Sequence, residues 1–139
     1  MNPITVSTVV QAPLETTWRA FTEPEYITEW NFAVDTWHCP EATNDLRIGG
    51  TFSYRMAARD GSFGFDFGGT YTALEPHKSL AYTLGDERKV QVDFEPLPNG
   101  QTRVTEVFDP ETTNPEEMQR NGWQAILDNF KKHTEAMSH

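Results

Sequence analysis

The C-terminal segment, residues 114–139, constrains the fold most, because it is the one long amphipathic helix that the sequence predicts. Asn114 suits the cap of this helix, Pro115 its first position, and Glu116 and Glu117 complement its dipole. Apolar residues then recur at helical spacing: Trp123, Ile126, Leu127, Phe130 and Met137. No other predicted element is long enough to cover one face of a sheet.

The chain before this helix alternates apolar and polar residues with the two-residue period of β-strands. One strand is expected at residues 4–10, and about six antiparallel strands follow later, with hairpin turns at residues 60–61 and 98–100. The paired glycines Gly68 and Gly69 interrupt one run and predict a bulge or a sharp bend. A single sheet with one apolar face needs a cover, which the C-terminal helix provides.

Two short helices are expected directly after the first strand. Pro13 suits the first position of a helix that carries Trp18 and Phe21 at helical spacing. A capping-box pattern around Pro24 starts a second helix that carries Trp30. Two short helices at this place in the chain are unusual, and they narrow the choice of fold.

Residues 31–45 have no regular period and are expected to form a loop rich in aromatic residues. Loops usually run on the surface and are polar, so an apolar loop must fold over a core edge or a cavity mouth. Trp37 is a candidate for such a mouth, and His38 is either a polar lid residue or a surface histidine. The strands are expected to resume at Leu46 and Ile48.

Bulk properties exclude several classes of protein. The 139 residues fit a single soluble domain spanning residues 1–139. A net charge of -10 without a Lys/Arg cluster argues against nucleic-acid and membrane partners. No apolar run reaches the length of a membrane span, and the N-terminus lacks the features of a signal peptide. Cys39 is the only cysteine, so no internal disulfide can form, and a cytoplasmic location is expected. The protein is expected to be a monomer or a homodimer.

Several short segments, in this order and spacing, carry a family resemblance over essentially the whole chain: Ala12-Pro13 with Trp18, Pro24-Glu25 with Trp30, Gly49-Gly50-Thr51-Phe52, Gly69-Thr70-Tyr71, Val104-Thr105-Glu106, and Gly122-Trp123 with Ile126-Leu127. With the element order, they resemble the helix-grip fold of the START and birch-pollen-allergen superfamily, called SRPBCC. Within it the chain looks like the family homologous to the activator of heat shock protein 90 ATPase. The resemblance implies an α+β fold in which a curved antiparallel sheet wraps a long C-terminal helix.

The same resemblance implies a deep cavity between helix and sheet. In relatives the cavity holds lipids, hormones, polyketides or other apolar molecules, and some relatives catalyse cyclisation or hydrolysis. The co-chaperone activity of the namesake belongs to longer proteins with an additional N-terminal domain. The fold therefore does not settle the function of this chain.

The cavity lining can be predicted from strand parity and from the helix stripe. The candidate ligand-binding residues are Trp30, Trp37, His38, Phe52, Tyr54, Met56, Phe65, Phe67, Tyr82, Phe94, Glu106, Gly122, Trp123 and Leu127, with Val92 and Phe130 also expected to face inward. Plain core packing is the alternative for each of them. Gly122 favours a pocket, because a glycine inside a helix costs about 1 kcal/mol relative to alanine and must be offset by close packing or by room for a ligand.

Glu106 is the anomaly in this pattern, because it shares the expected inward face with Val104 and Phe108. A buried carboxylate is unfavourable unless it is paired or protonated. Glu106 could anchor a hydroxyl or an amine of a ligand, or serve as a general base. The alternatives are a bulge that turns it to solvent, or a structural bond to a Tyr or a Trp.

No metal site, cofactor site or nucleophilic motif is expected. His38 and Cys39 are adjacent in an extended segment and point in different directions, so they do not form a ready-made dyad. One cysteine and four scattered histidines do not supply the ligand spacing of zinc. Three functions stay open: binding of a small apolar or amphipathic molecule, acid/base catalysis on such a molecule through Glu106, and a role as a protein-interaction or stress-related accessory factor.

Overall fold

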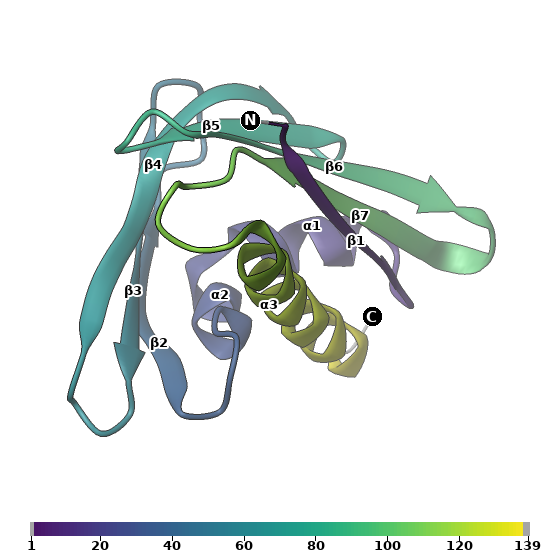
Figure 1. The fold of residues 1–139 in the computed structure, drawn as a ribbon. Coiled ribbons are helices and arrows are strands. Elements are labelled where there is room, and N and C mark those ends of the chain that lie inside the picture. Colours follow the sequence, from purple (N-terminus) through teal and green to yellow (C-terminus); the bar gives the residue numbers. More distant parts are fainter. Residues whose placement is uncertain (1, 138–139) are drawn as a thin grey trace.

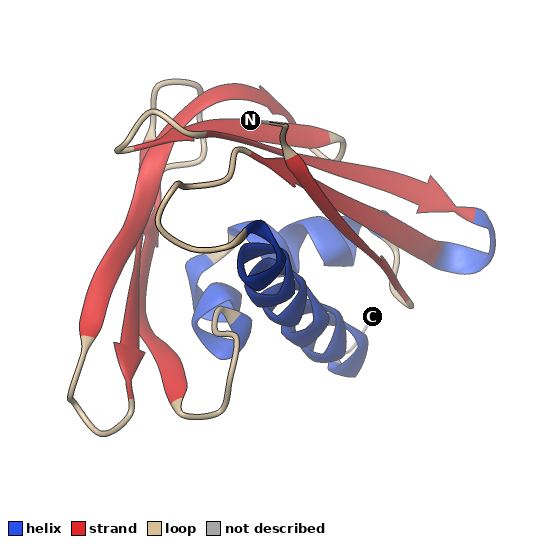
Figure 2. Ribbon diagram, in the orientation of Figure 1, coloured by secondary structure: helices blue, strands red, loops and turns tan. Residues whose placement is uncertain are grey.

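The computed structural model of the chain describes residues 2–137. These residues form a seven-stranded antiparallel sheet, in the order β1-β7-β6-β5-β4-β3-β2, and three α-helices that lie inside its curve (Figures 1 and 2). The strands are β1 (Ile4–Val10), β2 (Trp37–Asn44), β3 (Thr51–Ala58), β4 (Gly64–Glu75), β5 (Ser79–Leu84), β6 (Lys89–Leu97) and β7 (Gln101–Phe108). The helices are α1 (Leu14–Thr22), α2 (Pro24–Trp30) and α3 (Glu116–Ala136). This arrangement confirms the predicted α+β helix-grip fold.

The first and last strands pair with each other and form the wall against which α3 packs. In β1, Ile4, Val6 and Val10 are buried, as their alternation predicts. In the register of β1 and β7, Val6 lies opposite Glu106. Because Val6 is buried, the Glu106 side chain opposite it also lies on the concave face of the sheet.

The prediction of a loop over residues 31–45 is wrong, because Trp37–Asn44 form the edge strand β2. A register shift between His38 and Glu41 breaks the two-residue period, which removed the strand signal from the sequence. Pro40 lies in this irregularity, as expected for a proline in an edge strand. The strand expected at Leu46 and Ile48 is absent, and Ile48 lies in an exposed turn before β3.

Gly68 and Gly69 lie inside one continuous strand, β4, which curves through the bend of the sheet (Figure 1). Of the two predicted features, a bulge is absent at the glycines, and the register shift lies further on, between Tyr71 and Ala73. The glycines permit a close approach of the neighbouring strands. A Cβ atom at Gly69 would lie 2.6 Å from the carbonyl oxygen of Thr83.

Gly69→Ala is expected to destabilise the protein by about 1–3 kcal/mol, because the backbone of β5 would have to move away from the new methyl group. The matched control is Gly85→Ala, where an added Cβ meets no atom within 4 Å. Urea denaturation of both variants measures the difference in the free energy of unfolding. Equal stability of the two variants would show that the close approach at Gly69 has no energetic role.

The helix starts differ in detail from the predicted caps. Thr22 is the last residue of α1, and its hydroxyl donates to the carbonyl oxygen of Trp18 at 2.8 Å, so no capping box precedes α2. The cap position of α3 is occupied by Pro115 and not by Asn114, and no side chain caps this helix. Pro24 does occupy the first turn of α2, as predicted.

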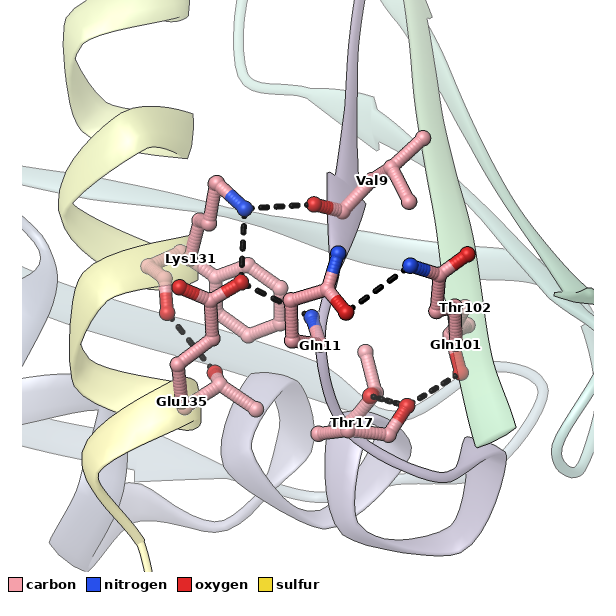
Figure 3. A network of polar contacts seen from close by, with 10 residues as sticks. Val9, Gln11, Thr17, Gln101, Thr102, Lys131 and Glu135 are labelled. Carbon is pink, nitrogen blue, oxygen red and sulfur yellow. Dashed lines mark hydrogen bonds and ion pairs between the residues drawn. The ribbon is translucent and has the colours of Figure 1, made fainter. Parts of the chain in front are cut away.

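The C-terminal half of α3 is fastened to the end of β1 (Figure 3). The Lys131 ammonium donates to the carbonyl oxygen of Val9 at 2.7 Å and pairs with the Glu135 carboxylate at 2.6 Å. The backbone N–H of Gln11 donates to the same carboxylate at 2.8 Å. The helix is therefore held by its C-terminal half, while its N-terminal half faces β4 and β7 with apolar side chains.

An aromatic core closes the space between the helices and the sheet near α1 and α2. Phe130 of α3 packs edge-on against Phe21 and Trp30, with ring centroids 5.3 and 5.0 Å apart. Phe94 of β6 packs edge-on against Phe21 and Trp18. Such edge-on contacts fill this part of the interior.

Candidate ligand-binding pocket

A pocket of about 190 Å³ lies between the N-terminal half of α3 and the concave face of the sheet. Its lining is almost entirely apolar and rich in aromatic rings. The lining residues are Phe21, Trp30, Asn31, Phe52, Tyr54, Met56, Phe65, Phe67, Tyr71, Leu80, Tyr82, Glu106, Trp123 and Ile126. An apolar concavity with few polar groups is the usual form of a small-molecule site.

The wall on the helix side is fixed by Trp123. Its ring stacks on Phe108 of β7, with centroids 3.9 Å apart and planes 10° apart, and meets Phe67 of β4 edge-on at 6.2 Å. On the sheet side, Phe52 packs against Tyr82 with centroids 4.7 Å apart. Because these rings support one another across strands and helix, the walls have a defined shape without a ligand.

Most predicted cavity residues come together in this lining. They are Trp30, Phe52, Tyr54, Met56, Phe65, Phe67, Tyr82, Glu106 and Trp123. Five other candidates lie outside it: Trp37, His38, Phe94, Gly122 and Leu127. Their assignment to a ligand site stays a prediction without support from the pocket geometry.

The positions of these five residues explain why they are not part of the lining. Phe94 and Leu127 are buried in the packed core. Trp37 and His38 lie on neighbouring β2 positions opposite Ala58 and Ala57, at the end of the sheet. Gly122 lies one turn before Ile126 on α3, and a Cβ there would meet no atom within 4 Å. Open space, and not close packing, therefore surrounds this glycine.

Sequence reasoning missed five lining residues: Phe21, Asn31, Tyr71, Leu80 and Ile126. Leu80 shares strand parity with Tyr82, and Ile126 belongs to the predicted helix stripe, so both had a signal. Asn31 had none, because it follows α2 and becomes buried only through the fold. Its side-chain amide donates to the sulfur of Met56 at 3.2 Å.

Glu106 lies in the middle of β7 and faces this pocket on the concave, buried face of the sheet. The residue is 8% exposed, and its cross-strand neighbours are Val6 and Val92. Burial raises the pKa of the Glu106 carboxyl from 4.5 to about 8. Burial is the only cause of this shift, so among residues 2–137 no cation or donor compensates it. Glu106 is therefore a mostly protonated carboxylic acid at pH 7.

Three tyrosines share the pocket with Glu106. Burial raises the pKa of Tyr82 and Tyr54 well above 10, and the nearby Glu106 raises that of Tyr82 further. The hydroxyl of Tyr71 donates to the Asn44 side-chain oxygen at 2.7 Å, outside the lining. These hydroxyls stay neutral at physiological pH, and Glu106 is mostly protonated, so the pocket is largely uncharged under those conditions.

The His38–Cys39 pair does not assemble a nucleophilic centre. The Cys39 thiol is buried, and burial raises its pKa, which disfavours the reactive thiolate. Within residues 2–137, no group of three or more His, Cys, Asp or Glu is placed to hold a metal ion. No helix within residues 2–137 is long and apolar enough to cross a membrane.

The pocket reaches the surface beside Phe65, which lines it and is 43% exposed. Trp37 and Phe63 extend this rim, because the Trp37 ring lies 6.0 Å from Phe65 and 5.9 Å from Phe63. The loop before β2 is tied to α3, since the Asn129 amide donates to the carbonyl oxygen of Phe32 at 2.5 Å. The rim is thus aromatic and is formed by residues of β2, of β4 and of the turn before β4.

The family comparison and the comparison with solved structures agree on the same family of proteins. Residues 11–135 match the model of a family described as Activator of Hsp90 ATPase homolog 1-like protein. The solution structure of the AHSA1-like protein from Aeromonas hydrophila is 40% identical, with a TM-score of 0.86, over 98% of this chain and 99% of that chain. A solution structure from Cytophaga hutchinsonii is 46% identical, with a TM-score of 0.82, over 100% of this chain and 99% of that chain.

A more distant crystal structure, from Chromobacterium violaceum, has the same fold. It is 26% identical and has a TM-score of 0.86, over 99% of this chain and 100% of that chain. No curated protein matches the chain. The names of the similar structures state no ligand and no reaction, so the pocket itself must carry the functional argument.

Proposed function

This chain belongs to the family of Activator of Hsp90 ATPase homolog 1-like proteins, and from that premise we propose that it binds a small apolar or amphipathic molecule between α3 and the sheet. The observation that carries this proposal is the aromatic pocket of about 190 Å³ with a single ionisable carboxyl. A space of this kind, left open inside an otherwise packed interior, is unfavourable unless a ligand uses it.

The volume of the pocket limits the size of the ligand. Drug-sized ligands occupy pockets of about 300–1,000 Å³, whereas an apolar cavity of about 150 Å³ holds benzene. The pocket of about 190 Å³ therefore fits one aromatic ring with a short substituent, or an aliphatic molecule of similar size. Sterols and long fatty acids would require the rim at Phe65 to move.

The exposed aromatic residues also favour an interaction surface, since Phe63 is 63% exposed. A patch of this kind without a pocket would support a protein-interaction role. Here Phe65 belongs to both the patch and the pocket lining, so we assign the patch to the pocket rim. Acid/base catalysis on a ligand would use the same Glu106 carboxyl. Recovery of the bound compound without chemical change would indicate binding without turnover.

Aromatic probes such as benzene, indole and naphthalene are expected to raise the melting temperature of the protein. Binding to the folded state alone stabilises it by about 2.7 kcal/mol at a hundredfold excess over the dissociation constant. Ile126→Trp should abolish this shift, because the indole would fill the pocket that Ile126 lines. Thermal denaturation with each probe provides the measurement.

The matched control is Met118→Trp, which places the same indole on an exposed position of α3. This variant should keep the response to the probes. If neither wild type nor Met118→Trp responds to any probe, the proposed function is wrong. A response that persists in Ile126→Trp would place the binding site elsewhere.

A further inference from the structure

The Glu106 carboxyl faces the pocket from a buried position, and among residues 2–137 no side chain pairs with it. It is 8% exposed, it belongs to the lining, and Val6 and Val92 flank it on the adjacent strands. A buried polar group is normally hydrogen-bonded, and a native structure that leaves one unpaired needs a reason. A ligand in the pocket would supply the missing partner.

We propose that the ligand carries a neutral hydrogen-bond acceptor, such as a carbonyl oxygen, which accepts a hydrogen bond from the protonated Glu106 carboxyl. This inference rests on the proposed function, because it specifies the ligand of the same pocket. The rest of the ligand is apolar, since the remaining lining offers mainly aromatic and aliphatic side chains. Burial keeps the carboxyl protonated, with a pKa of about 8, so the donor is present at neutral pH.

The other ionisable groups around Glu106 do not change this protonation state at neutral pH. The pocket contains the Tyr54 hydroxyl from β3, the Tyr71 hydroxyl from β4 and the Tyr82 hydroxyl from β5, and burial raises the pKa of each. β1 and β6 present Val6 and Val92. The remaining lining from the three helices consists of apolar side chains, Phe21, Trp30, Trp123 and Ile126.

Charged ligands fit this site less well. An anion would enter a pocket without a cationic side chain, in a protein with a net charge of -10. A cation would require Glu106 to lose its proton first, which lowers affinity about tenfold at pH 7 for a pKa of about 8. The attraction of a buried ion pair is largely offset by desolvation, so it does not recover this loss reliably. A neutral acceptor avoids both penalties.

Four probes of similar size separate these chemistries: acetophenone, α-methylstyrene, benzoate and α-phenylethylamine. Acetophenone and α-methylstyrene differ in one position, where a carbonyl oxygen replaces a methylene group. At about pH 6 we expect acetophenone to bind about tenfold more tightly than α-methylstyrene, since the latter leaves the acid unpaired. Dissociation constants from NMR titration give this ratio directly. At about pH 9.5 the ratio should fall to one or below, because a carboxylate cannot donate.

Two substitutions assign the preference to Glu106. Glu106→Gln retains a donor that does not titrate, so its preference for acetophenone should be independent of pH. Glu106→Leu has no donor, so it should bind α-methylstyrene and lose the preference for acetophenone. Thermal unfolding of both variants verifies that they are folded before they are titrated.

The outcomes separate this inference from the proposed function. Binding of acetophenone and α-methylstyrene with equal affinity at about pH 6, or a preference that survives in Glu106→Leu, would overturn the acceptor inference alone. Tighter binding of α-phenylethylamine or benzoate than of acetophenone at about pH 6 would also overturn it. If none of the four probes shifts the resonances of the pocket residues, the proposed function fails and the inference fails with it.

Discussion

Glu106→Gln is expected to stabilise the protein by about 3 kcal/mol at pH 7. The buried carboxyl has a pKa of about 8 in the folded state, against 4.5 for the ordinary group. Each unit of difference corresponds to about 1.4 kcal/mol, so the penalty is about 3 kcal/mol at pH 7 and about 5 kcal/mol above pH 9. Glutamine preserves the shape of the protonated acid and removes this penalty.

The pH dependence of this effect has a definite sign. The raised folded pKa means that the native state binds the proton more tightly than the unfolded chain does. The contribution of Glu106 to stability is therefore fully present below pH 4.5 and is lost as the pH rises through 8. Urea denaturation from about pH 4 to pH 9 should show equal stability of the two proteins at the acid end and a widening gap above it.

The control is Glu41→Gln, which removes the same charge at an exposed position of β2. A surface substitution of this kind usually changes stability by less than about 0.5 kcal/mol. A constant difference between wild type and Glu106→Gln across the whole pH range would mean that Glu106 is solvated. The acceptor inference would then lose its basis.

Phe130→Ala is expected to destabilise the protein by about 3–5 kcal/mol, which is a large part of the 5–15 kcal/mol available to a domain. Phe130 is 0% exposed and holds α3 against the rings of Phe21 and Trp30. Its removal would leave a cavity at the point where helices and sheet meet. The midpoint of urea denaturation should fall accordingly.

Met118→Ala is the matched control on the same helix, because Met118 is 60% exposed. It should leave the free energy of unfolding within about 0.5 kcal/mol of wild type. If Phe130→Ala were as mild as Met118→Ala, α3 would not be the principal cover of the sheet. The fold would then depend on other contacts.

The fold could be predicted because its main elements have regular periods. The alternation of Ile4, Val6 and Val10 and the stripe that contains Phe130 reflect burial on one face, which the structure confirms. The edge strand β2 could not be predicted, since its register shift near Pro40 removes the period. Edge strands pair on one side only, so their sequences carry weaker constraints.

The pocket could be predicted only in part, because parity separates inside from outside but not core from cavity. Phe65 and Phe67 were assigned from strand alternation, and they line the pocket. Leu127 and Ile126 are neighbours on the helix stripe, yet Leu127 lies in the core and Ile126 faces the pocket. This division depends on the rotation of α3 against the sheet, which no local sequence pattern specifies.

The most direct test of the binding pocket is a crystal structure of the protein soaked with bromobenzene, with anomalous data collected at the bromine edge. We expect one bromine peak inside the pocket, between Phe52, Phe67 and Trp123. The side chains around it should stay close to their positions in the free protein, because aromatic contacts already support the walls. A pocket filled by these side chains, with bromine found only on the surface, would contradict the account.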